Sequence, residues 1–154
     1  MRYIHNAKIT IFLKPEEYIG NNDLIEKIKN VFYKLVPLDF IKEKLVLNQE
    51  IVESFENRKL KIYSLEILKE THTNVFINTL KELLKSEQCK LLVAQKESRL
   101  DDDLFFYLRL NKELILKDVV ELTDIGDCVH IKMHVAAFPK NKENALNVVS
   151  KIFK

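Results

Sequence analysis

The run Leu104-Phe105-Phe106-Tyr107-Leu108-Arg109-Leu110 decides the fold predicted for this sequence. Its residues alternate with the period of two that a β-strand imposes on its side chains. One face is purely apolar and consists of Leu104, Phe106, Leu108 and Leu110. The other face carries Phe105, Tyr107 and Arg109, and two rings beside a guanidinium suit stacking on nucleobases or packing against a partner. We therefore expect a strand that buries one face and offers the other for binding.

Patterns in the rest of the chain predict an α+β fold. Alternation predicts strands at 7–13 and 129–138 and a hairpin formed by 45–52 and 59–67, while a short apolar segment predicts a strand at 90–94. Apolar residues at helical spacing predict helices at 24–35, 71–85 and 145–153. This order favours a single domain, residues 1–154, with a mostly antiparallel sheet and three main helices packed on one face.

The alternation within 59–67 is less regular than in the other strands. Leu60 and Ile62 fall on one side, whereas Leu65 falls on the other. A β-bulge or a bend after Tyr63 explains such a slip of phase. We accordingly expect Tyr63 to point outward, together with Lys59 and Lys61.

Composition excludes several classes of protein. The 154 residues are 47% hydrophobic and contain no apolar run long enough to span a membrane, and the N-terminus does not have the pattern of a secretory signal. Only two glycines occur, so a glycine-rich phosphate loop is excluded. Cys89 and Cys128 have no metal-ligand spacing and are typical of reduced thiols in a cytoplasmic protein. The net charge of +2 confines any nucleic-acid site to a local patch.

Candidate catalytic and metal-binding groups do not converge. On a strand, His130 and His134 lie on one face but about 13 Å apart at roughly 3.3 Å per residue, which is too far to share an ion. Asp101-Asp102-Asp103 is typical of a solvated turn before a hydrophobic strand, because consecutive carboxylates diverge there. No serine or cysteine lies in a nucleophile motif. We therefore expect no catalytic residue, metal site or cofactor.

Basic and aromatic residues form the remaining candidate site. The candidates are Arg58, Lys59 and Lys61 on the hairpin, and Phe105, Tyr107, Arg109 and Lys112 on and just after the strand at 104–110. If these strands share a sheet, their outward residues form a positive face with rings available for stacking. The alternative is that a helix covers the rings and the lysines only keep a sheet edge soluble. Alternation does not decide between the two, because it does not say which face the helices cover.

Three short motifs give the chain a family resemblance. They are Glu70-Thr71-His72-Thr73-Asn74-Val75-Phe76-Ile77, then Arg109-Leu110-Asn111-Lys112 at the end of the strand, then Val135-Ala136-Ala137-Phe138-Pro139. With these motifs the chain resembles small archaeal proteins regarded as exosome-associated RNA-binding subunits, most strongly from about residue 65 onward. Where that family tends to have His-x-Gly-Asn, this chain has His72-Thr73-Asn74-Val75.

The resemblance implies a fold like that of a ribosomal protein that binds 5S rRNA, and a non-enzymatic role in RNA processing or with an exosome. The resemblance implies that His72, Arg109 and Lys112 are RNA-binding positions. The resemblance and the residue patterns together predict a cytoplasmic protein. Its expected RNA contacts are Arg58, Lys59, Lys61, His72, Tyr107, Arg109 and Lys112. The alternative is a protein–protein adaptor or homodimer in which a partner covers the ring-bearing face.

Overall fold

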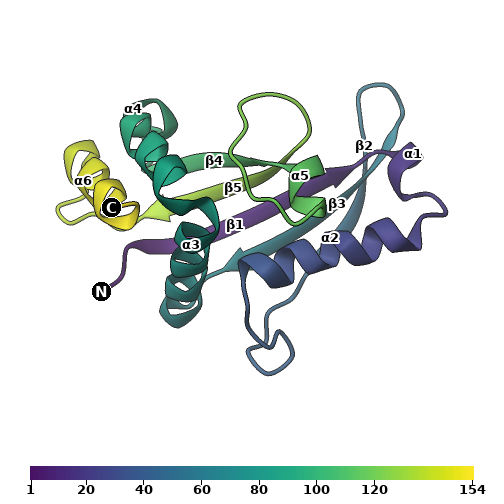
Figure 1. Cartoon of the computed structure of the whole chain (residues 1–154), viewed down its shortest axis with the longest axis horizontal. Helices are drawn as coiled ribbons and strands as arrows, with labels where there is room; N and C mark the ends of the chain where they lie inside the picture. Colours follow the sequence, from purple (N-terminus) through teal and green to yellow (C-terminus); the bar gives the residue numbers. More distant parts are fainter.

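Five strands form one antiparallel sheet in the order β2-β3-β1-β5-β4 in the computed structural model, which describes residues 1–154 (Figure 1). The strands are β1 (Ile4–Leu13), β2 (Asn48–Glu53), β3 (Lys59–Ile67), β4 (Phe105–Asn111) and β5 (Cys128–Val135). The helices are α1 (Pro15–Tyr18), α2 (Asn22–Leu35), α3 (Glu70–Ala94), α4 (Lys96–Arg99), α5 (Lys112–Leu116) and α6 (Lys142–Ile152). The expected α+β fold and antiparallel sheet are confirmed.

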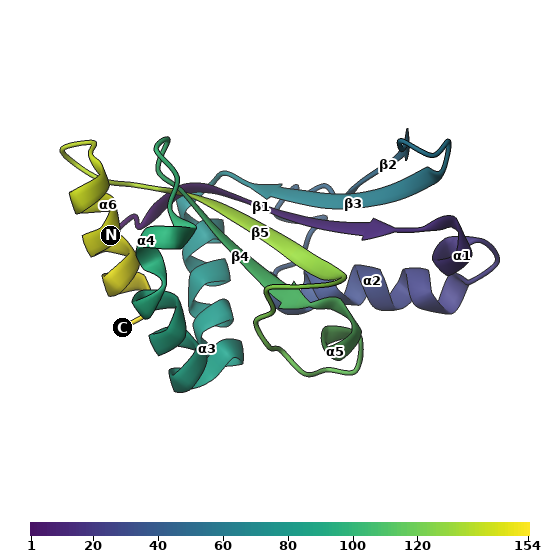
Figure 2. The ribbon, with the colours of Figure 1, turned by 90° about the horizontal axis from the view of Figure 1, so that it is seen from above.

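All the helices lie on one side of the sheet, which leaves its other face uncovered (Figure 2). The covered face contributes Ile9, Ile11, Phe106, Leu108 and Ile131 to a continuous apolar core. The long helices contribute Phe32, Phe76, Leu80 and Val149 to the same core. Burying this much apolar surface against one face fixes which side of β1, β3, β4 and β5 is inside.

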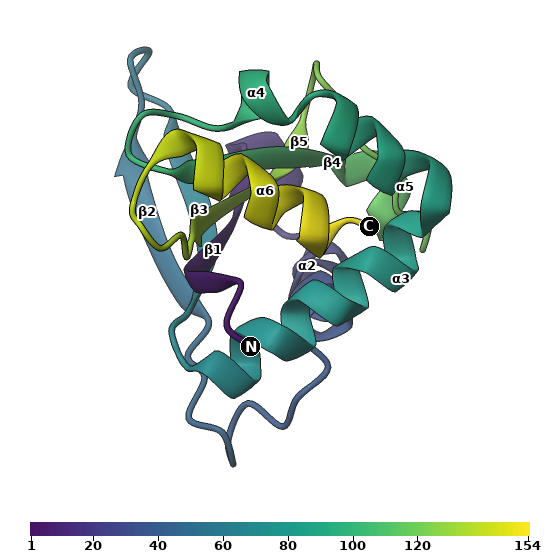
Figure 3. The same cartoon turned by 90° about the vertical axis from the view of Figure 1, so that its left-hand side faces the viewer.

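The two ends of the molecule differ in what packs beneath the sheet. Helix α6 lies at the end where both chain termini are found, beside α3 and α4 (Figure 3). Helix α2 lies under the other end, with α1 and α5 close to it (Figure 1). None of these helices combines the length and the apolar composition needed to cross a lipid bilayer.

Two sequence-based expectations about local structure are wrong. Residues 90–94 are helical, because α3 continues to Ala94 past a break at Lys85, whose φ is 63°. A short apolar run does not distinguish a strand from a buried helix segment, and here Cys89 and Leu92 pack into the core as helical residues.

The expected bulge in β3 is also absent. The pairing with β1 is regular from Lys61 to Ile67, and Tyr63, Leu65 and Ile67 are all buried on the covered face. The apolar pair Leu60 and Ile62 lies on the uncovered face instead. The apparent slip of phase came from two apolar residues on the outside of the sheet, which hydrophobicity alone assigns to the core.

Candidate nucleic-acid interface

The uncovered face of the sheet brings three unpaired cations onto three adjacent strands. Lys8 of β1 lies opposite Lys132 of β5, which in turn lies opposite Tyr107 of β4. In the next row, Thr10 lies opposite His130, which lies opposite Arg109. Lys8, Lys132 and Arg109 are exposed, and their side chains make no ion pair or hydrogen bond within the chain. We call the uncovered side of the sheet the open face.

Aromatic rings lie among these cations. The Lys132 Nζ atom is 4.2 Å from the centroid of the Phe105 ring and 5.7 Å from that of Tyr107. Phe105 stacks on His134 with a centroid separation of 4.5 Å, and Phe12 meets His130 edge-on at 5.5 Å. Tyr107 is 40% exposed and Phe12 is 36% exposed, so these two rings are the ones available to a ligand.

A hollow of about 490 Å³ occupies the middle of the open face. All five strands contribute to its lining, which includes Lys8, Thr10, Phe12, Glu50, Ile62, Tyr107, Arg109, His130 and Lys132. The single carboxylate, Glu50, belongs to the edge strand β2. A concave surface whose charges are mainly of one sign concentrates ions of the opposite sign, so the hollow favours an anionic ligand.

The Tyr107 ring is held by the loop that precedes β4. Its hydroxyl donates a hydrogen bond of 2.8 Å to Asp101 Oδ2, while Asp101 Oδ1 accepts from the backbone N–H groups of Asp103 and Phe105. This hydrogen bond raises the pKa of Tyr107 above its ordinary value. Burial by itself raises the pKa of Asp101, but the donors around the carboxylate outweigh it and the pKa is lowered. The ring is therefore positioned before any ligand arrives.

The two histidines of the open face favour the neutral state. Burial lowers the pKa of His130, and the nearby Arg109 lowers it further. Burial also lowers the pKa of His134, with His5 and Lys140 adding to the effect. Near neutral pH the positive charge of the open face therefore comes from its lysines and from Arg109.

Lys112, an expected RNA contact, lies away from the open face. It is only 3% exposed, and its Nζ donates to Phe12 O at 3.1 Å and to Glu17 Oε2 at 3.0 Å. The same atom forms an ion pair with Asp127 Oδ2 at 2.8 Å. These three contacts use the three donors of the ammonium group. Lys112 therefore ties the start of α5 to β1, α1 and the loop before β5.

The other cations that were expected to contact RNA also lie away from the open face. His72 is buried in α3, with its Nε2 atom 3.2 Å from Glu43 Oε2. Lys61 lies on the helix-covered side, with its Nζ 5.8 Å from the Tyr18 ring centroid, and Lys59 shares that side by alternation along β3. Arg58 pairs with Glu16. The expectation that Lys59, Lys61 and Tyr63 face outward with the rings of β4 is wrong, because β3 has the opposite phase.

Of the expected RNA contacts, only Tyr107 and Arg109 lie on the open face. The prediction missed Lys8, Phe12 and Lys132 as members of the same surface. Their alternation was visible in the sequence, since Lys8, Thr10 and Phe12 share one side of β1 and His130, Lys132 and His134 share one side of β5. The missing information was the strand order, which places β5 next to β4 and β1 next to β5, and which separates β3 from β4 by two strands.

A single antiparallel sheet backed by helices on one side, with rings and cations on its free side, places this chain in the class of open-faced α+β domains, some of which stack RNA bases on rings of the free face. Residues 10–135 match the sequence model of a family described as RNA binding, and the chain belongs to this family. It is 24% identical over 145 residues to an RNA-binding protein of Pyrococcus abyssi, covering 94% of this chain and 90% of that protein.

Solved structures share the fold. A protein of Archaeoglobus fulgidus superposes with a TM-score of 0.81 at 19% identity, covering 97% of this chain and 99% of the other. A DUF54 protein of Methanothermobacter thermautotrophicus superposes with a TM-score of 0.74 at 21% identity, covering 99% of both chains. At these identities the likeness establishes the fold and not the residues of a site.

Proposed function

We propose that this chain is a non-enzymatic, cytoplasmic RNA-binding protein whose open face is the contact surface. The observation that carries the proposal is the cluster of Lys8, Lys132 and Arg109, three unpaired cations beside two exposed rings on the uncovered side of the sheet. Phosphates neutralise cations of this kind and release counterions. The family description and the relative from Pyrococcus abyssi support RNA as the ligand.

The ligand that suits this surface is single-stranded. Tyr107 and Phe12 present ring faces or edges to the hollow, and bases stack on such rings only when they are not already stacked in a duplex. In this proposal Lys8, Lys132 and Arg109 contact successive phosphates. His72, Lys112 and the hairpin cations Arg58, Lys59 and Lys61 are not part of the contact surface, because they are buried, paired or on another side.

Fluorescence anisotropy with a labelled single-stranded RNA tests this surface. The triple variant Lys8→Ala, Arg109→Ala and Lys132→Ala is expected to bind at least about a hundredfold more weakly at low salt. For three phosphate contacts, a plot of the logarithm of wild-type affinity against the logarithm of salt concentration is expected to have a slope of about −2. The slope of the triple variant is expected to be close to zero, because its phosphate contacts are lost.

The matched control is Lys27→Ala, Lys42→Ala and Lys90→Ala, which removes the same charge from exposed lysines on α2, on the loop that follows it and on α3, none of which lines the hollow. These lysines form no ion pair, so the control is expected to keep nearly all of the affinity. Equal losses in the two triple variants, or no wild-type binding at low salt, would refute the assignment of the open face.

The finer role that we propose is in RNA processing, with an exosome as partner. It rests on the family resemblance carried by the motifs around His72, Arg109 and Phe138. Affinity purification of the tagged chain from an archaeal host, followed by mass spectrometry, is expected to recover exosome subunits. Recovery that disappears after ribonuclease treatment would point to RNA-bridged association, and no recovery would argue against this partner.

A second candidate function is that of a protein–protein adaptor or homodimer. It is favoured by β2, an edge strand in which all six residues are exposed, with Ile51, Val52 and the adjacent Phe55 in solvent. An open edge of this kind is a template for pairing with another strand. Light scattering after size exclusion separates the candidates, because an apolar complex persists at high salt whereas RNA binding weakens.

A further inference from the structure

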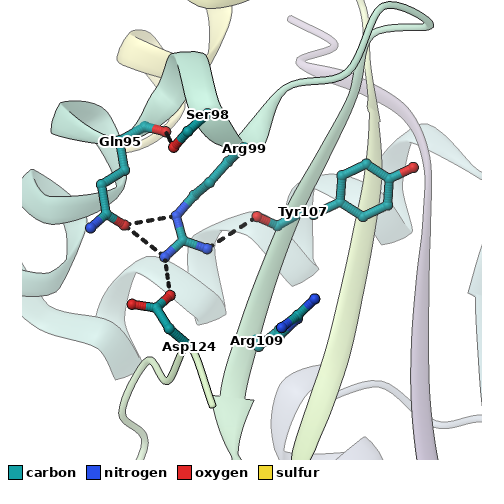
Figure 4. Close-up of a pocket in the computed structure, with 6 residues that line it drawn as sticks. All are labelled: Gln95, Ser98, Arg99, Tyr107, Arg109 and Asp124. Carbon is teal, nitrogen blue, oxygen red and sulfur yellow. Dashed lines mark hydrogen bonds and ion pairs between the residues drawn. The ribbon is translucent and has the colours of Figure 1, made fainter.

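A second hollow lies at the outer edge of β4 and is continuous with the open face. It has a volume of about 510 Å³ and is lined by Gln95, Ser98, Arg99, Tyr107, Arg109 and Asp124 (Figure 4). Its volume falls within the range of about 300–1,000 Å³ that is usual for small-ligand pockets. Tyr107 and Arg109 line both hollows, so the two hollows adjoin one another. We call it the edge notch.

The notch exists because the edge of β4 is covered at its ends but not in its middle. Leu100 forms a bridge to Phe106 at one end, and Leu122 forms a bridge to Leu110 at the other. Between these two bridges the edge is occupied by the side chain of Arg99, whose Nη1 donates to Tyr107 O at 3.4 Å. The gap is therefore a fixed feature of the fold, bounded by two chain segments that pair with β4.

Arg99 orients two polar groups of the notch, the Gln95 amide and the Asp124 carboxylate, before a ligand binds. Arg99 donates to Gln95 Oε1 from Nε at 3.0 Å and from Nη2 at 2.7 Å, and it reaches Asp124 Oδ1 at 3.3 Å (Figure 4). These contacts use Gln95 Oε1 and one oxygen of Asp124. The second Asp124 oxygen, the Gln95 amide N–H groups and the Arg109 guanidinium make no hydrogen bond within the chain. Arg99 orients the Gln95 amide and the Asp124 carboxylate, so these two groups cost little to organise on binding, while the unpartnered Arg109 side chain is free to turn toward a ligand.

This array suits a nucleobase better than a phosphate. The Asp124 carboxylate repels a phosphate but accepts hydrogen bonds from base N–H groups. Arginine pairs with the O6 and N7 acceptors of guanine, which also offers an N2 amino donor for a carboxylate. Uracil lacks this combination of two adjacent acceptors and an exocyclic amino group.

We propose that the edge notch binds one unstacked guanine of the RNA on the open face, with Arg109 donating to its O6/N7 edge and Asp124 accepting from its amino group. This inference rests on the proposed function, and it adds base selectivity to a surface that otherwise contacts phosphates and ring faces. Tyr107, at the boundary of the two hollows, is the surface on which the neighbouring base stacks.

The test compares three labelled oligonucleotides by fluorescence anisotropy: oligouridine, the same strand with one central guanosine, and the same strand with inosine there, which lacks the 2-amino group. Wild-type protein is expected to bind the guanosine strand at least about fivefold more tightly than oligouridine. A preference of about fivefold is the lower end of the discrimination that one bidentate contact to a base gives. Inosine is expected to lose part of this preference. Asp124→Ala is expected to reduce the guanosine-to-inosine ratio to about one.

The readout is a ratio of affinities, because Asp124→Ala also frees the charge of Arg99 and strengthens binding to every RNA. Asp102→Ala is the matched control, since it removes the same charge from an exposed loop outside the notch and should keep the wild-type ratio. Binding of all three strands with equal affinity, or an Asp124→Ala ratio equal to wild type, would overturn the guanine site and leave the proposed function standing. Failure of every strand to bind would overturn both.

Discussion

Arg109 and Lys112 are two cations of one short motif, three residues apart, and the fold gives them opposite roles. Arg109 lies on the open face, exposed and without a partner, between the two hollows. Lys112 lies at the start of α5, buried and bonded to three oxygens from β1, α1 and the loop before β5. The difference arises at Asn111, which ends β4 and caps α5 by accepting from Leu114 N–H at 3.0 Å. The chain turns inward at that point.

This comparison shows that a motif recognised by resemblance mixes residues that hold the fold with residues that face a ligand. An exposed cation with no partner costs the protein little to replace, whereas a buried cation leaves its carboxylates uncompensated when it is removed. Substitutions at the two positions should therefore separate stability from binding.

Replacing Lys112 has the largest expected effect. Lys112→Met keeps the length of the side chain but leaves Glu17 and Asp127 without their cation. We expect a loss of about 2–3 kcal/mol in the free energy of unfolding, somewhat below the usual cost of breaking a buried pair because Asp127 is half exposed and stays hydrated. Urea denaturation followed by circular dichroism measures it.

The control is Lys117→Met, which removes an exposed pair between the C-cap residue of α5 and Glu113 of that helix. That pair should contribute at most about 0.5 kcal/mol. If both variants unfold at the same urea concentration, Lys112 does not stabilise the fold as described. If Lys112→Met is stable but binds RNA poorly, the lysine is a ligand contact after all.

Replacing Arg109 should give the converse result. Arg109→Ala is expected to change the free energy of unfolding by no more than about 0.5 kcal/mol, because the side chain makes no contact that the fold requires. RNA affinity is expected to fall about tenfold, which corresponds to about 1.4 kcal/mol. Anisotropy and urea denaturation on the same protein preparation give both numbers. A large loss of stability without a loss of affinity would reverse the roles that we assign to the two cations.

A change of pH should have the smallest effect and should act on binding and stability in opposite directions. The pKa values of His130 and His134 are lowered in the folded protein, so both rings are neutral near neutral pH and gain protons only below pH 6.5. Protonation adds positive charge to the open face, so RNA affinity is expected to rise about twofold as the pH falls through that range.

The free energy of unfolding changes in the opposite direction and falls as the pH falls. A base with a lowered pKa binds fewer protons in the folded state than in the unfolded state. Its contribution to the free energy of unfolding is therefore present above pH 6.5 and is lost as the pH falls through the lowered pKa. The double variant His130→Gln and His134→Gln is expected to remove the rise in affinity and the part of the loss of stability that these two histidines cause. Affinity that does not depend on pH in the wild type, or that depends on it equally in the double variant, would exclude these histidines as the cause.

The sequence predicted the class of fold and most of its elements because the signals are local. Alternation in 7–13, 104–110 and 129–138 and helical spacing in 24–35 each record which side of an element is buried. The two failures have local causes as well. A short apolar run at 90–94 has no period of its own, and Leu60 and Ile62 placed apolar side chains on the outside of β3.

The sequence by itself determined that β4 has one apolar face and one face with Phe105, Tyr107 and Arg109, since side-chain alternation depends only on neighbouring residues. Only the tertiary structure decided that this second face is uncovered, that Lys8 and Lys132 join Arg109 there, and that Lys112 is buried. The physical reason is that strand order and helix placement depend on contacts between residues far apart in the chain. A pattern of neighbours does not record those contacts.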